Sequence, residues 1–373
     1  MNFPQVKTDW YLSTFLFYLF IIFAVYILSF STTNMKIIGF RRKKYDVWSL
    51  LVGIILIFIK GFGTTGRDLR TGYYNCFIKA TTWNNFPDNT VEPGYKLLNV
   101  IIRNLTDEYW IFVLIISLIT ILPVIHFLKK YKEKIDLPTA LLMYCSIFFF
   151  NTFSPLRMCV AASLGLFAYD ALVEKKTKKA LVWIIVASTF HTSALILFVP
   201  FFFSQIKWMN KSIIFISLAS LFLLAYIGRN SFTEMMVRNE RYYIYQSFST
   251  VDIGFEQFIY FIPLFFILFF GRKFDNKNKY FTILSFSFVA TAFCAGTLGY
   301  IVSIFGRFRD MFLPLIIIIP YYLKIIKSRM PRHRTLITVL TILYCILRFY
   351  IYISQYYISE DLMPYSNIFG GII

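Results

Sequence analysis

Long apolar blocks recur along the whole chain, and they constrain its fold more than any other feature. Most are about 17–25 residues long, enough for an α-helix to cross a hydrocarbon core of about 30 Å. Charged residues make up only 15% of the 373 residues, against about 25% in an average globular protein. No stretch shows the alternating ten-residue pattern of a transmembrane β-barrel. The sequence therefore predicts an all-α polytopic membrane protein, with residues 1–373 as one integral membrane domain.

The formal net charge of +19 does not indicate a nucleic-acid partner. The positive residues gather in short loops between apolar blocks, as the positive-inside rule predicts for cytoplasmic loops. The expected partner of these charges is the lipid bilayer, through its anionic headgroups. Six loops are of this kind: residues 34–46, 129–136, 174–179, 205–212, 271–280 and 324–334.

Placing all six basic loops in the cytoplasm orients the chain. Both termini then lie outside, and the first apolar block is a retained helix. This arrangement predicts about ten transmembrane helices: residues 11–31, 47–63, 109–128, 137–153, 157–173, 213–228, 257–270, 281–299, 308–323 and 335–353.

The apolar block at residues 180–203 allows two interpretations. One span across the membrane would invert every later loop, whereas a hairpin of two short arms keeps all six basic loops inside. The hairpin would turn near His191 and would bring the total to about 12 crossings if its arms are counted. Such a hairpin is tolerated inside protein or beside a water-filled cavity, where its backbone groups find partners. Charge placement favours the hairpin.

The predicted outer face differs from the basic one. It holds two long loops, at residues 64–108 and 229–256, and the tail 354–373, in which Arg, Asp, Glu, His and Tyr are mixed. Loops of such length in a compact protein are usually functional or disordered, and aromatic anchors make disorder the weaker option here. We therefore expect the functional site on this face.

Several arginines lie at the predicted outer ends of helices. Arg157 opens the helix that follows Ser154-Pro155, Arg307 and Arg309 precede another helix, and Arg67 follows a Gly/Thr stretch. Guanidinium groups bind phosphate oxygens in bidentate fashion, so converging arginines could clamp a pyrophosphate. Arg157 and Arg309 could instead be interfacial anchors whose side chains extend to lipid headgroups.

Three other ionisable side chains are candidates for acid–base chemistry. A lone histidine such as His191 is more often a hydrogen-bonded packing residue than a base, but its position at the hairpin turn opposite the outer arginines makes a catalytic imidazole the alternative. Asp68 and Glu92 could accept a proton or could pair with an arginine. The Tyr-rich stretch that begins at Arg241 could bind sugar rings or form an aromatic belt at the membrane surface.

Missing motifs narrow the chemistry further. The chain has no P-loop, GxGxxG, HExxH or CxxC pattern, and no DxD-like pair on its cytoplasmic side. These absences argue against ATP coupling and against a metal-dependent sugar-nucleotide transferase. We expect neither a cofactor nor a metal site.

A series of short motifs resembles the EpsG family, the Wzy-like membrane polymerases of bacterial exopolysaccharide and capsule. In chain order these motifs are Gly66-Arg67-Asp68, Tyr73-Tyr74, Glu92-Pro93-Gly94-Tyr95, Ser154-Pro155-Leu156-Arg157, Phe190-His191-Thr192-Ser193-Ala194, Gly306-Arg307-Phe308 and Pro364-Tyr365.

The resemblance implies a GT-C-like glycosyltransferase in the bacterial plasma membrane. Such a protein joins oligosaccharide repeat units, carried on undecaprenyl pyrophosphate, into exopolysaccharide, capsule or O-antigen on the outer leaflet. A chain-length regulator is a candidate partner. Two other kinds of protein are alternatives: a flippase or exporter of lipid-linked oligosaccharide, and another outer-leaflet transferase such as a ligase or an O-acyltransferase.

The resemblance also suggests roles for the candidate residues. Arg157 and Arg307 would stabilise the leaving pyrophosphate. His191, Asp68 or Glu92, in that order, would take the proton of the acceptor hydroxyl. Further substrate contacts are expected from five side chains: Arg67, Arg309, Tyr73, Tyr95 and Arg241.

Overall fold

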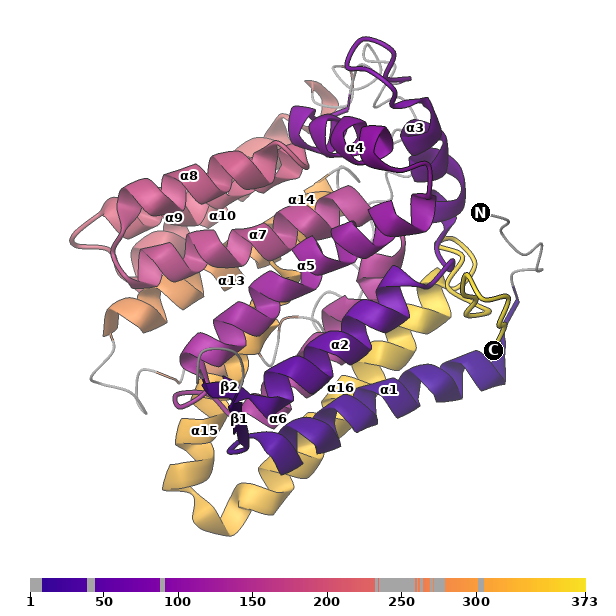
Figure 1. Ribbon diagram of the computed structural model, residues 1–373. Coiled ribbons are helices and arrows are strands. Elements are labelled where there is room, and N and C mark those ends of the chain that lie inside the picture. Colours follow the sequence, from indigo (N-terminus) through magenta and orange to yellow (C-terminus); the bar gives the residue numbers. More distant parts are fainter. Residues whose placement is uncertain are drawn as a thin grey trace.

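Most of the described chain is helical, and the helices run side by side in one bundle (Figure 1). The fold comes from a computed structural model, which describes residues 9–38, 44–87, 91–231, 279–300 and 305–373, with isolated positions between 234 and 271.

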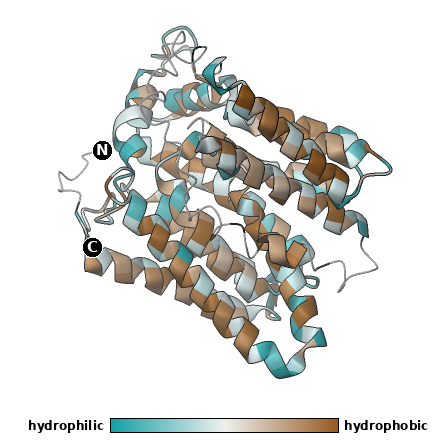
Figure 2. Ribbon diagram, turned by 180° about the vertical axis from the view of Figure 1, so that it is seen from behind, coloured by the Kyte–Doolittle hydropathy of each residue, from teal (hydrophilic) through white to brown (hydrophobic). Residues whose placement is uncertain are grey.

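Six helical segments of the described chain are long and apolar enough to cross a membrane. They are α1 (Leu12–Thr32), α5 (Tyr109–Tyr131), α7 (Leu156–Val173), α13 (Lys279–Gly299), Gly306–Arg329 and Pro331–Tyr356. Shorter apolar segments are α2 (Val47–Gly61), Leu137–Phe153, Thr192–Gln205 and α10 (Lys211–Ile227). Figure 2 shows hydrophobic residues along the helices and hydrophilic residues in the connecting loops. The chain is a multi-pass, all-α membrane protein.

The segments agree with nine of the predicted helices, and the tenth, 257–270, lies largely outside the described residues. Two of the nine predicted helices, 308–323 and 137–153, are interrupted. Gly306–Arg329 consists of α14 (Gly306–Asp310), the 3-10 helix η9 (Leu313–Ile318) and α15 (Ile319–Arg329). Pro331–Tyr356 consists of the 3-10 turn η10 (Pro331–His333) and α16 (Arg334–Tyr356).

The basic loops lie together at one end of the bundle, here called the basic end. Ion pairs connect neighbouring loops: Lys132–Asp46 at 2.6 Å, Lys130–Glu174 at 2.5 Å and Lys327–Asp136 at 2.8 Å. Lys134, Lys175 and Lys279 line one pocket, and Lys207 shares a second pocket with Lys279. A two-stranded ribbon that was not predicted, β1 (Lys36–Ile38) and β2 (Lys44–Asp46), also lies there (Figure 1). The prediction that the basic loops share one side of the bundle is therefore confirmed for the described residues.

Residues 180–203 belong to a hairpin. Helix α8 (Thr177–Ser188) leaves the basic end, and the chain returns through the 3-10 helix η5 (Thr192–Leu197) and α9 (Phe198–Gln205). Thr177 donates a hydrogen bond to the Gln205 side chain at 3.4 Å, so both ends of the segment lie together. The charge argument for the hairpin is thus correct, and the single span is excluded.

The opposite end of the bundle holds the start of α1 and the C-terminus and is called the terminal end here (Figure 1). The predicted loop 64–108 is more regular than expected, because it contains the π-helical turn η2 (Leu69–Tyr73), α3 (Tyr74–Lys79) and α4 (Pro93–Leu105). Helix α4 buries Tyr95, Asn99 and Ile102, whose spacing of four and three residues places them on one helical face. The loop 229–256 lies almost entirely outside the described residues.

The segment Leu137–Phe153, predicted as one helix, changes its hydrogen-bonding pattern twice. It consists of α6 (Leu137–Tyr144), the π-helical segment η3 (Cys145–Phe149) and the 3-10 helix η4 (Phe150–Phe153). Irregular backbone at membrane depth needs polar partners inside the protein. The buried Lys60 ammonium donates to the Thr152 carbonyl, and the Cys159 thiol donates to the Asn151 carbonyl. These contacts hold the irregular end of the segment.

Gly66 occupies a position that only glycine fits. Its φ is +118°, and an added Cβ would lie 2.3 Å from the Phe153 carbonyl oxygen. We expect Gly66→Ala to lower the melting temperature of the purified protein markedly, because such backbone strain costs about 1–3 kcal/mol before the clash is added. Gly72→Ala is the matched control, since a Cβ at Gly72 meets nothing within 4 Å. Equal melting temperatures for the two variants would contradict this account.

Candidate functional site

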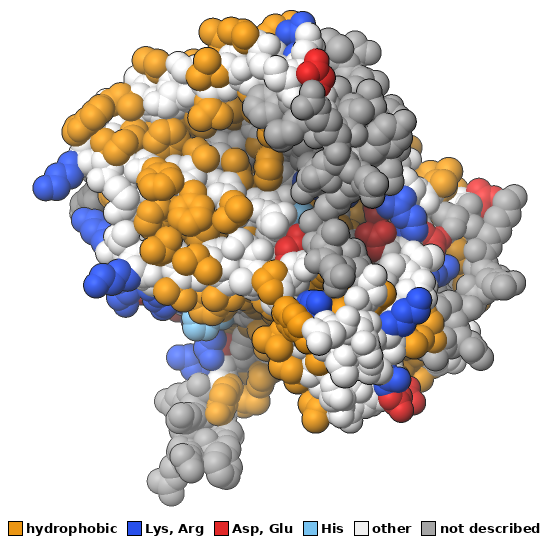
Figure 3. Space-filling model, turned by 90° about the horizontal axis from the view of Figure 1, so that it is seen from above, with side chains coloured by type: hydrophobic (Ala, Val, Ile, Leu, Met, Phe, Trp, Pro, Cys, Tyr) orange, Lys and Arg blue, Asp and Glu red, His pale blue; other side chains and the backbone are white. Residues whose placement is uncertain are grey.

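A cavity of about 190 Å³ lies at the terminal end, where segments far apart in the sequence meet. In the view from above, acidic and basic side chains gather near the middle of this face, beside a broad hydrophobic surface (Figure 3). Seven of the predicted site residues line the cavity: Arg67, Asp68, Tyr73, Arg157, His191, Arg307 and Arg309. The fold therefore brings most of the candidates into one place.

Glu92 and Tyr95 do not line the cavity but lie behind Arg157. The Arg157 guanidinium pairs with the Glu92 carboxylate at 2.7 Å, and the Glu92 side chain is only 3% exposed. The guanidinium also lies over the rings of Tyr73 and Tyr95, with its central carbon 5.9 and 5.5 Å from the two ring centres. Glu92 and Tyr95 thus position Arg157 at the cavity wall.

The charge state of Glu92 follows from its surroundings. Burial by itself would raise the pKa of the carboxyl, but Arg157, His191 and the Thr192 N–H together lower it below its ordinary value. The Glu92 oxygens also accept hydrogen bonds from the N–H and the hydroxyl of Thr192, at 3.3 and 3.4 Å. An ionised carboxylate held in this way suits an anchoring role better than proton transfer.

The start of helix α4, which follows Glu92, is docked on the hairpin turn. The N–H groups of Gly94 and Tyr95 donate to the Thr189 carbonyl at 2.8 and 3.3 Å. A Cβ at Gly94 would lie 2.3 Å from the Thr189 hydroxyl oxygen, so glycine permits this close approach. The turn that carries His191 and the helix that carries Glu92 therefore form one rigid wall.

His191 is the N-terminal cap of η5, and its imidazole is buried with 8% exposure. Its Nδ1 accepts a hydrogen bond from the Ser193 N–H at 3.2 Å. Since a backbone N–H can only donate, a neutral imidazole with this bond carries its proton on Nε2. In that form Nε2 is a hydrogen-bond donor.

Two of the predicted arginines, Arg309 and Arg67, lie beside aspartates at the cavity. Arg309 pairs with Asp310 at 2.8 Å, and the more exposed Arg67 lies 3.5 Å from Asp68. Four arginines and three carboxylates line the cavity, and Glu92 pairs with Arg157 from behind. The guanidinium groups are the part of this lining that can bind an anionic ligand.

Five polar residues that line the cavity were not among the predicted site residues: Asn151, Asp310, Tyr352, Tyr356 and Glu360. Tyr352 and Tyr356 lie four residues apart on α16, on one helical face, and Glu360 continues the same interval. The Tyr352 hydroxyl donates to Asn151 Oδ1 at 3.2 Å. The four-residue spacing was the available signal, whereas Asn151 stood alone in an apolar run.

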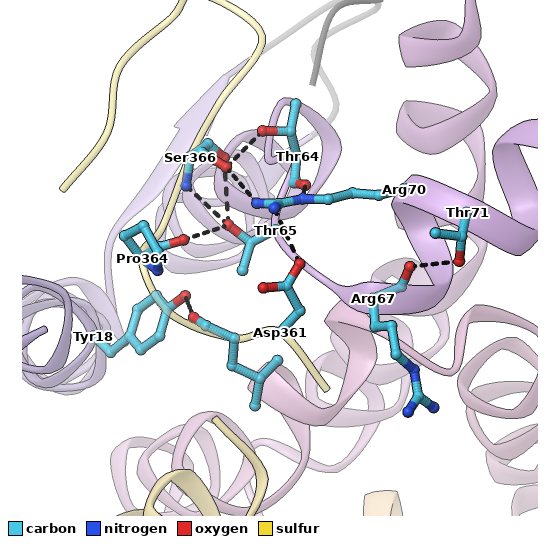
Figure 4. A network of polar contacts seen from close by, with 10 residues as sticks. Tyr18, Thr64, Thr65, Arg67, Arg70, Thr71, Asp361, Pro364 and Ser366 are labelled. Atoms are coloured by element: carbon cyan, nitrogen blue, oxygen red, sulfur yellow. Dashed lines mark hydrogen bonds and ion pairs between the residues drawn. The ribbon is translucent and has the colours of Figure 1, made fainter. Parts of the chain in front are cut away.

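The C-terminal tail is held in place beside the cavity by a polar network (Figure 4). Arg70 pairs with Asp361 at 3.0 Å and donates to the Thr64 carbonyl at 2.8 Å and to the Ser366 hydroxyl at 3.0 Å. The hydroxyl of Tyr18 in α1 donates to the Leu362 carbonyl at 2.8 Å. The tail is thereby tied to the segment that follows α2.

Within the described residues, no three His, Cys, Asp or Glu side chains are arranged so that they could hold a metal ion. The groups suited to a charged ligand are the guanidinium groups of the cavity. Arg241, the remaining predicted contact, lies outside the described residues.

Comparison with known proteins supports the resemblance seen in the motifs. No curated protein and no solved structure matches the chain. The model of the EpsG family, which comprises Wzy-like polymerases, matches residues 46–367. This range covers most of the chain and every segment that lines the cavity. The chain therefore belongs to the EpsG family.

Proposed function

We propose that this protein polymerises oligosaccharide repeat units at the outer leaflet of the bacterial plasma membrane. One observation carries the proposal: arginines from three separate segments and an imidazole share one cavity at the end opposite the basic loops. Lysine-rich loops mark the cytoplasmic side, which would place the cavity outside. The family supports a polymerase of lipid-linked units.

The proposed reaction transfers the growing glycan from its undecaprenyl pyrophosphate carrier to a hydroxyl of an incoming lipid-linked unit. Negative charge develops on the departing pyrophosphate, and preorganised donors lower the barrier where such charge appears. Arg157, Arg307 and Arg309 offer planar, permanently charged forks that match phosphate oxygens. The Nε2–H of His191 adds a neutral donor from the hairpin wall.

Three tyrosines, Tyr73, Tyr352 and Tyr356, line the same cavity. Tyrosine combines a flat apolar ring with a polar tip, which suits contact with a sugar. These side chains are proposed to hold the sugars that react. The lipid tails would lie between helices, where apolar side chains face the bilayer.

The test is an assay with the purified protein in membranes and a lipid-linked repeat unit as its sole substrate. We expect a ladder of products that differ by one repeat, together with release of polyprenyl pyrophosphate. Arginines supply the positive charge in this mechanism, so excess EDTA should leave the ladder unchanged. Movement of the substrate across the membrane without any longer product would identify a flippase and contradict the proposal.

A further inference from the structure

We propose that Glu360 is the general base of the transfer reaction and removes the proton of the acceptor hydroxyl. The inference rests on the proposed function and deepens it. It names a residue that none of the sequence motifs contains, and it replaces His191 in that role. The geometry of the cavity carries the argument.

Glu360 lies where a base is needed. It follows α16 and lines the same cavity as Arg157, His191 and Arg307. The pyrophosphate and the attacking hydroxyl must both reach one anomeric carbon, so the base and the arginines must share a cavity. Glu360 meets this condition.

The backbone around Glu360 is fixed from both sides. The Glu360 N–H donates to the Tyr356 carbonyl at 2.9 Å, and the Arg67 N–H donates to the Glu360 carbonyl at 2.9 Å. The backbone carbonyl of the next residue, Asp361, accepts a hydrogen bond from the Gly66 N–H at 3.1 Å, and its carboxylate pairs with Arg70 at 3.0 Å. These backbone contacts fix residue 360 beside the cavity, next to the tail network drawn in Figure 4.

The other acidic side chains are worse placed for this task. Glu92 lies behind Arg157 and is held as an ionised partner. Asp310 pairs with Arg309 at 2.8 Å, and Asp68 lies 3.5 Å from Arg67 at the exposed rim. Each of these carboxylates is thus already engaged by a neighbouring guanidinium.

His191 is also unsuited in its neutral form. Its Nδ1 is engaged by the Ser193 N–H, so Nε2 carries the proton. A ring nitrogen that already bears a proton cannot accept another. His191 is therefore assigned as a donor and Glu360 as the acceptor of the proton.

The surroundings of Glu360 also favour proton uptake. Burial raises the pKa of its carboxyl above the ordinary value, and this effect outweighs the lowering by Ser154, Arg67 and Arg307. Asp68 raises it further. The other ionisable groups that line the cavity are His191, Arg157, the Arg309–Asp310 pair, Tyr73, Tyr352 and Tyr356. Cys159 in α7 and the Arg70–Asp361 pair lie nearby. A carboxyl whose pKa is raised toward the working pH is a more effective base.

The step balances without any further reactant. The acceptor O–H bond breaks and its proton moves to the Glu360 carboxylate. The acceptor oxygen forms a bond to the anomeric carbon, while the bond from that carbon to the pyrophosphate oxygen breaks. The electron pair leaves with the polyprenyl pyrophosphate, beside the cavity arginines. The proton later passes from Glu360 to water.

The test compares Glu360→Gln with wild type in the repeat-unit assay. We expect kcat to fall by about 10²–10⁴-fold, the usual contribution of a general base, with little change in KM. The acidic limb of the wild-type pH profile should lie above the ordinary Glu pKa of about 4.3 and should disappear in the variant. Formate, a small carboxylate base, should raise the rate of Glu360→Ala but not that of wild type.

Glu108→Gln provides a matched control, because Glu108 is exposed and does not line the cavity. It should retain wild-type kinetics. Turnover by Glu360→Gln within about twofold of wild type would overturn the inference, since a base contributes far more than that. A loss with an unchanged acidic limb and no rescue by formate would indicate a structural role and would also overturn it. Absence of a product ladder from the wild-type protein would instead contradict the proposed function on which this inference rests.

Discussion

Arg157→Ala is expected to abolish polymer formation while the protein still inserts into the membrane. The substitution removes a guanidinium from the cavity wall and also leaves the Glu92 carboxylate, 3% exposed, without its 2.7 Å partner. Removing one partner of a buried ion pair typically costs about 3–5 kcal/mol. We therefore expect a lower melting temperature together with the loss of the product ladder.

A second substitution separates the two effects of Arg157→Ala. Glu92→Gln in the same chain removes the buried charge, so the double variant should recover much of the lost stability. It should not recover polymerisation, because the guanidinium is still missing. Melting temperatures and ladder assays of both single variants and the double variant complete the cycle. Polymer of wild-type length from either variant that lacks Arg157 would rule out a role of its guanidinium in the reaction.

Arg307→Ala should also suppress polymerisation, but without loss of stability. Arg307 is exposed, lines the cavity and belongs to the short helix α14. Loss of one preorganised donor to developing negative charge typically lowers kcat by about 10²–10³-fold. Arg307→Lys should restore part of this rate, because lysine keeps the charge but lacks the bidentate fork.

The matched control for Arg307 is Arg332→Ala. Arg332 is also exposed but lies in η10 at the basic end. We expect wild-type kcat and an unchanged melting temperature from this control. Equal rates for Arg307→Ala and Arg332→Ala would show that Arg307 does not act on the pyrophosphate.

Charge placement alone predicted the hardest topological feature correctly. Residues 180–203 have the length and apolarity of an ordinary span, and only the lysines on either side distinguish a hairpin from a crossing. The structure returns Gln205 to Thr177 and so agrees with the lysines. The cost of moving charged groups across a bilayer explains why this signal is readable in the sequence.

The candidate site was predicted only in part. Short motifs identified the residues of the cavity that lie beside glycines or open a helix, such as Arg67, Arg157 and His191. They did not reveal that Glu92 and Tyr95 lie behind Arg157, because burial depends on how α4 docks against the hairpin turn. Nor did they point to Glu360, whose carbonyl is bound by a residue nearly 300 positions earlier.

The sequence by itself determined the properties that depend on local composition. Apolar length indicated the membrane spans, lysine placement indicated which loops lie together at one end of the bundle, and motif order indicated the family. The tertiary structure alone decided which polar groups share the cavity and which of them form ion pairs with one another. These relations depend on contacts between α4, α7, α14 and the C-terminal tail, and no local pattern encodes a distance between segments so far apart.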